Sequence, residues 1–189
     1  GNGLSVGRIA AGLLAWTLSF AAAAAPAAEK FTFKGIELGS GIAAVANNPK
    51  YDCRAASAPA ADTICGLRPR EKETIAGAPV RSLFFFYYGG KLTSLSIHLE
   101  EKDFATVTEA LRGKYGAAPA RVENLRNLKG VSFENRIYTW KSPTETLTAQ
   151  RYAGRVDQSV IHYVADDAIR RIEERRAAVG LGLIADEPV

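Results

Sequence analysis

The sequence predicts an α+β protein in which two tandem helix-plus-strands repeats form one antiparallel sheet with helices on one face. After residue 29, a helical pattern followed by strand patterns occurs twice along the chain. Short turns join neighbouring strand segments, which favours antiparallel pairing. A length of 189 residues with 47% hydrophobic content suits a single packed domain.

The duplication is predicted because similar residues recur 64 positions apart in the sequence. Matching positions in two hairpin segments then carry identical or similar side chains, which is typical of a repeated unit. The alternative is chance similarity between segments that are both turn followed by strand. The matched pairs are Tyr88 with Tyr152, Gly90 with Gly154, Lys91 with Arg155, Leu92 with Val156, Ile97 with Ile161, and His98 with His162.

Residues 1–28 are expected to be a cleaved signal peptide that directs the protein to the periplasm. The segment carries one charge, at Arg8, then an apolar stretch from Ile9 to Phe20 and a run of small residues. The alternative is an uncleaved membrane anchor, because the uncharged run is about long enough to cross a bilayer. The remaining boundaries are a single α+β domain over 29–180, with repeat one at about 29–99, repeat two at about 100–166, a C-terminal helix at 167–179 and a tail at 180–189.

The two cysteines, Cys53 and Cys65, are expected to form a structural disulfide. An even pair of cysteines in an exported chain most often forms such a bridge. Closing a loop of this length should stabilise the fold by about 3 kcal/mol in the chain-entropy model. A redox-active pair would need the two-residue spacing of exchange motifs, which this pair lacks.

Three helices are predicted from apolar periodicity and capping residues. The first covers 39–46 with Ser40 as its N-cap, and the second begins after Asp103 and ends at Gly116. The third covers 167–179, and its charged residues indicate a solvated face. The predicted strands are 80–88 and 91–99 joined by Gly89 and Gly90, then 136–141, 144–152 and 158–164.

Several segments together carry a resemblance to a known family. They are FKGIELGSGIAAV, the cysteine-bridged loop, YYGGKL, LRGKYGAAP and VIHYVAD. Over residues 31–166 the chain resembles the β-lactamase-inhibitor-like fold, which the SmpA/OmlA envelope lipoproteins and many periplasmic proteins share. The resemblance implies tandem helix-strand repeats, a curved sheet and binding without catalysis.

Composition leaves few residues for catalysis, cofactors or nucleic acid. The net charge is +4 without a block of Lys and Arg, which argues against a nucleic-acid partner. Two histidines, two cysteines and no methionine leave little for a metal cage, so we expect no metal, no cofactor and no catalytic residues. The alternative is a hydrolase or small-ligand enzyme that uses His98 or His162.

The strongest functional pattern is aromatic. Both faces of the strand at 80–88 are apolar, although a sheet covered by helices on one face should be polar on the other. Aromatic residues beside an arginine are typical of binding surfaces. The alternative is that both faces are covered within the molecule. We expect an open binding face formed by Phe84, Phe86, Tyr88, Arg136, Tyr138 and Trp140.

These observations favour a soluble periplasmic protein-binding or scaffold module that recognises another envelope protein through the aromatic sheet face. We expect no stable membrane insertion after the signal is cleaved. The remaining alternative is a structural envelope protein whose aromatic face is buried in a homodimer.

Overall fold

A computed structural model describes residues 30–58 and 61–182 of the chain. Its helices and strands follow in this order: β1 (Thr32–Phe33), β2 (Ile36–Glu37), α1 (Ala43–Ala46), β3 (Tyr51–Ala58), β4 (Ala61–Leu67), β5 (Thr74–Ile75), β6 (Ala78–Tyr88), β7 (Lys91–Glu100), a 3₁₀ turn η1 (Glu101–Asp103), α2 (Phe104–Tyr115), β8 (Ala120–Arg126), β9 (Ser132–Lys141), β10 (Glu145–Gln150), β11 (Gln158–Ala165) and α3 (Asp166–Gly180).

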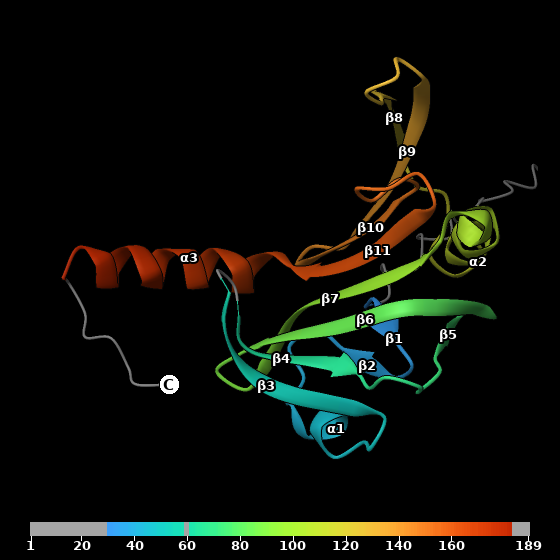
Figure 1. Cartoon of the computed structure of the whole chain (residues 1–189). Helices are drawn as coiled ribbons and strands as arrows, with labels where there is room; N and C mark the ends of the chain where they lie inside the picture. Colours follow the sequence, from blue (N-terminus) through green and yellow to red (C-terminus); the bar gives the residue numbers. More distant parts are fainter. Residues whose placement is uncertain (1–29, 59–60, 183–189) are drawn as a thin grey trace, which may run out of the picture.

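The strands form one large antiparallel sheet, which confirms the α+β class (Figure 1). Its order is β3-β4-β6-β7-β11-β10-β9-β8, and the short β5 pairs with β6. The first four strands therefore run across the sheet in chain order, and the last four run in the reverse order. A separate two-stranded sheet is formed by β1 and β2.

The register of the central pair, β7 and β11, determines how the two histidines lie relative to each other. Ile97 pairs directly with Ile161, and these two positions are 64 residues apart. His98 pairs with Val160, and His162 pairs with Ser96. The two histidines therefore lie diagonally across the strand pair, on the same face of the sheet.

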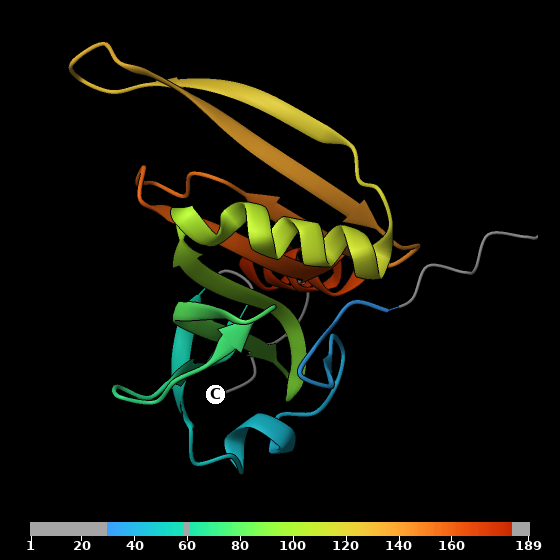
Figure 2. The ribbon, with the colours of Figure 1, turned by 90° about the vertical axis from the view of Figure 1, so that its right-hand side faces the viewer.

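The hydrophobic core lies on one face of this sheet. Phe104, Val107 and Leu111 of α2 and Val45 of α1 are buried in it. Figure 2 shows α2, in yellow-green, lying across the strands below the long β8–β9 hairpin. Burial alternates along β11 and along the second halves of β6 and β7, so the core face carries Leu83, Phe85 and Tyr87 of β6, Leu95, Ile97 and Leu99 of β7, and Ile161 and Tyr163 of β11.

Two elements extend away from this packed centre. The helix α3 leaves the end of β11 and continues beyond the strands, while the β8–β9 hairpin projects from the other end of the sheet (Figure 1). Only Ile172 of α3 is buried, and all seven residues of β8 are exposed. Neither element is surrounded by core, so both present most of their side chains to solvent.

The first predicted helix is wrong in its extent. The helix α1 covers only Ala43–Ala46, and the Ser40 hydroxyl donates a hydrogen bond to the carbonyl of Glu37 instead of capping the helix.

Asp103 does occupy the N-cap position of α2, although its side chain makes no capping hydrogen bond. The Gly89–Gly90 turn lies where it was predicted, and both residues have positive φ angles, of 57° and 76°, which a tight hairpin turn requires.

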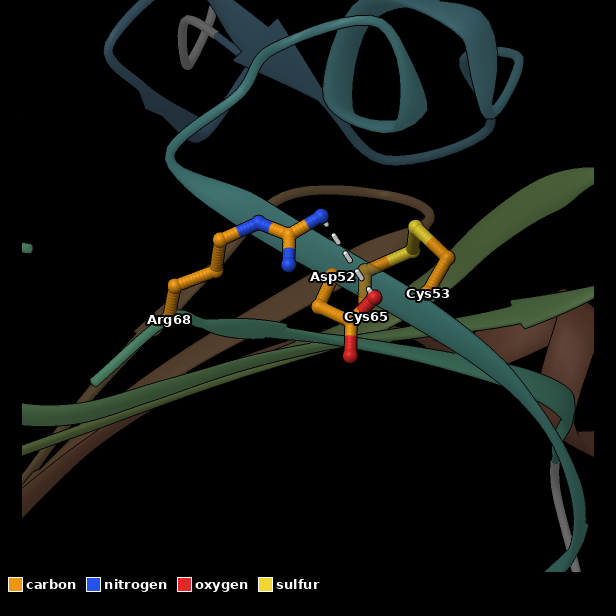
Figure 3. Close-up of a disulfide and its surroundings, with 4 residues drawn as sticks. All are labelled: Asp52, Cys53, Cys65 and Arg68. Atoms are coloured by element: carbon orange, nitrogen blue, oxygen red, sulfur yellow. Dashed lines mark ion pairs between the residues drawn. A yellow bond between two sulfur atoms is a disulfide. The ribbon is translucent and has the colours of Figure 1, made fainter.

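The predicted disulfide is confirmed. Cys53 and Cys65 lie directly opposite each other on β3 and β4, with 4.0 Å between their Cα atoms (Figure 3). The sequence predicts a loop between the two cysteines, but most of this segment belongs to β3 and β4. Beside the disulfide, an ion pair of 3.6 Å joins Asp52 of β3 to Arg68, the residue that follows β4.

Parts of the expected domain organisation lie outside the described residues. These parts are the signal peptide of residues 1–28 and residues 183–189 of the tail. Within residues 30–58 and 61–182, none of the helices combines the length and the apolar character needed to cross a membrane.

Candidate binding surfaces

The structure does not bring the predicted binding residues onto one face. Cross-strand partners share a face of the sheet, and the register runs from Phe85 through Leu95, Tyr163 and Leu147 to Trp140. Trp140 and Tyr138 therefore lie on the core face, where they are only 4% and 7% exposed. The expectation that both rings are open to a partner is wrong. Side chains of α2 pack against Tyr138, and Trp140 packs against Tyr138 and donates a hydrogen bond to Gly116 at the end of α2.

Phe84, Phe86 and Tyr88 do lie on the opposite face of β6. All three are half-buried, in contrast to their fully buried neighbours on the same strand. We call this surface the open face and define it by half-buried residues that the register places together. They are Ile64, Phe84, Phe86, Tyr88, Ser96, His98, Thr148, Val160, His162 and Val164.

The local sequence gives the open face an apolar strip beside a polar one. On β4, Gly66 pairs with Phe84 and Ile64 pairs with Phe86. A Cβ atom on Gly66 would lie 3.4 Å from two ring carbons of Phe84, so the missing side chain leaves room for the ring over β4. Tyr88 lies at the end of the strip, where the Arg176 guanidinium of α3 sits 5.8 Å from its ring centre.

The two histidines lie near the middle of the open face. Burial lowers the pKa of His98, and burial together with the nearby His98 lowers the pKa of His162. Catalysis by a histidine would require an acid or serine within hydrogen-bond reach. Among the residues that the structure describes, none forms a hydrogen bond with the buried Nδ1 atom of His98. Within the described ranges, no group of three or more His, Cys, Asp or Glu side chains is arranged to hold a metal ion.

The lowered pKa values predict a dependence of stability on pH. Below a pH of about 6.5 the unfolded chain takes up protons on both histidines, while the folded chain resists protonation. The free energy of unfolding should therefore fall as the pH falls from 7.5 to 5. Urea denaturation at several pH values measures this. A His98→Gln, His162→Gln variant isolates the histidine contribution, and an equal pH dependence in the variant would contradict the prediction.

The remaining predicted residue, Arg136, lies at a second surface. A groove of about 400 Å³ runs between α2 and β9. We call it the arginine groove and define it by its lining: Glu101, Lys102, Phe104, Ala105, Thr108, Glu109, Arg112, Arg136, Tyr138 and Arg151. Tyr138 is thus buried in the core and also contributes to the lining of this groove.

Some residues with binding potential were not found from the sequence. Arg112 and Arg151 join Arg136 only through the packing of α2 and the β10–β11 loop beside β9. The projecting β8–β9 hairpin also carries exposed apolar side chains, and no sequence pattern marked them. They are Val122, Leu125, Leu128 and Val131.

Comparisons with protein-family models, with curated proteins and with solved structures find no match for this chain.

Proposed function

We propose that this protein is a non-catalytic binding module that recognises another envelope protein through the open face of its sheet. The observation that carries this proposal is the half-buried pair Phe84 and Phe86 on the face opposite α2. Solvent-accessible aromatic rings bordered by polar residues are what the centres of protein interfaces contain.

The shape of the open face favours a protein as its occupant. Phe84, Phe86 and Ile64 form an apolar strip, and Ser96 and Thr148 continue the surface across β7 and β10. A broad sheet surface of this kind offers contact area to a protein surface, whereas small molecules prefer concave pockets that enclose them. Recognition would bury the rings, while the hydroxyl groups beside them hydrogen-bond the partner.

We also propose that the sheet arose by duplication of one helix-plus-strands unit, as in the β-lactamase-inhibitor-like fold that the sequence resembles. The mirrored strand order supports it, since a two-fold axis between β7 and β11 would relate β3-β4-β6-β7 to β8-β9-β10-β11. The direct pairing of Ile97 with Ile161, which are 64 residues apart, is compatible with such an axis. The axis would place His98 and His162 as equivalent residues at the centre of the open face.

The proposed location is the periplasm. A disulfide between Cys53 and Cys65 supports this, because such bonds persist in oxidising compartments and are rare in the cytosol. The basic and apolar segment within residues 1–28 has the pattern of an export signal. An envelope protein is therefore the partner that the open face would meet.

The open-face proposal predicts that a Phe84→Ala, Phe86→Ala variant loses its partner. Losing two aromatic anchors at the centre of an interface should weaken binding at least about 30-fold. Immobilised wild-type protein and variant would be incubated with envelope extract. A protein retained by the wild type would then be purified, and its dissociation constant measured by calorimetry.

Phe133→Ala is the matched control, because it removes a half-buried phenylalanine that packs against Tyr152, outside the apolar strip. Circular dichroism shows whether each variant is folded. The proposal is wrong if no retained protein depends on Phe84 and Phe86. If light scattering instead shows a homodimer that the double variant dissociates, the occupant is a second copy of this chain.

A further inference from the structure

We propose that the arginine groove binds a carboxylate carried by an acidic segment of a partner protein. This inference rests on the proposed binding function and names the chemistry of the partner. The arginine groove is formed by residues on the core side of the sheet. Binding at the groove can therefore be tested independently of binding at the open face.

The backbone holds two arginines next to each other at one side of the groove. The Arg151 N–H donates a hydrogen bond of 3.0 Å to the carbonyl of Arg136. The adjoining Tyr152 N–H donates to the Asn135 side chain at 2.9 Å, which fixes the start of this loop against β9. Both guanidinium groups line the same groove, and their like charges repel each other.

The carboxylates in the groove compensate only part of this charge. Glu101 pairs with Arg151 at 2.8 Å, and Glu109 pairs with Arg112 at 2.8 Å. The exposed Arg136 side chain has no ion pair or hydrogen bond with the residues that the structure describes. Lys102 pairs at 3.0 Å with Glu100, which lies outside the lining. Arg136 is therefore the cation of the lining that no ion pair among the described residues compensates, and an anion beside it would lower the electrostatic energy of the groove.

The floor of the groove is aromatic and fixes the direction of one cation. The rings of Phe104 and Tyr138 lie 6.1 Å apart, and the Arg112 guanidinium sits 5.2 Å above the Tyr138 ring. Stacking of this kind holds the planar guanidinium in place. The rings are 6% and 7% exposed, so only a small part of each reaches the groove beside Ala105, and an apolar group of a partner would contact that part.

These features select a carboxylate that stands beside an apolar group. The guanidinium of Arg136 matches the two oxygens of a carboxylate and can bind both. The aromatic floor favours an apolar side chain next to that carboxylate. An acidic protein segment supplies the two together, whereas inorganic phosphate supplies charge alone.

The test uses the blocked tripeptide acetyl-Glu-Phe-Glu-amide as its probe and follows backbone amides by NMR. We expect the amides of α2 and β9 to shift in a saturable way and those of the open face to stay unchanged. Arg136→Gln should weaken the affinity about fivefold, the upper range for an exposed ion pair. Arg126→Gln removes the same charge from exposed β8, outside the groove, and should change the affinity little.

Four outcomes would overturn the inference. They are no saturable shift with millimolar peptide, equal binding of acetyl-Gln-Phe-Gln-amide, equal losses from Arg136→Gln and Arg126→Gln, and tighter binding of inorganic phosphate to the same amides. The last would assign the groove to a small anion. The Phe84→Ala, Phe86→Ala variant should bind the tripeptide like the wild type, so failure of the open-face proposal leaves this result unaffected.

Discussion

Replacing Trp140 with alanine should lower the free energy of unfolding by about 3–5 kcal/mol, the usual loss for a large buried aromatic side chain. The ring is 4% exposed and packs against Tyr138, with 6.0 Å between the ring centres. Its Nε1–H donates a hydrogen bond of 2.9 Å to the carbonyl of Gly116, which ties β9 to the end of α2. Urea denaturation followed by circular dichroism measures the loss.

Two matched variants separate the contributions at this site. Trp140→Phe keeps an aromatic ring but leaves the Gly116 carbonyl without its donor, which should cost about 1 kcal/mol plus a smaller packing loss. Phe86→Ala truncates a half-buried ring on the open face and should cost about 1–2 kcal/mol. Equal losses for Trp140→Ala and Phe86→Ala would contradict the assignment of Trp140 to the core.

The elements that the sequence predicted well have a strong periodic pattern and clear ends. The helix α2 spaces Phe104, Val107 and Leu111 on one side, and Gly116 ends it with a φ of 89°. The β6–β7 hairpin combines two apolar strands with a glycine turn. In both cases the local pattern and the tertiary packing demand the same structure.

The strands that the sequence missed lack such a pattern. The whole of β8 is exposed, so neither of its faces needs apolar residues and no alternation arises. The β3–β4 pair is rich in alanine, which has low strand propensity, and pairing with β6 decides its structure. Tertiary contacts therefore determine these strands where local preference is weak.

The residues of the candidate site also could not be placed from local sequence alone. Alternation separates Phe84 and Phe86 from Phe85, but it cannot tell which set faces the helices when both are aromatic. The register across β7, β11 and β10 is needed to place Trp140 on the side of Phe85. The arginine groove combines η1, α2, β9 and the loop after β10, so no single stretch of sequence contains its pattern.

Removing the disulfide with a Cys53→Ala, Cys65→Ala variant should lower the free energy of unfolding by about 3 kcal/mol in the chain-entropy model. The bond joins residues 12 positions apart, and it fixes the edge strand β3 to β4. Urea denaturation of the variant and of the wild type, with and without a reducing agent, measures the effect. The reducing agent should destabilise the wild type and leave the variant unchanged.

Hydrogen exchange decides how the disulfide stabilises the fold. If it acts on the unfolded chain, the most protected amides at the centre of the sheet, in β7 and β11, should lose protection in the variant by the same free energy that denaturation measures. If it only prevents fraying of the edge, the loss should be confined to β3. The second result would contradict the chain-entropy account, because a constraint on the unfolded state must lower the protection of every amide that exchanges by global unfolding.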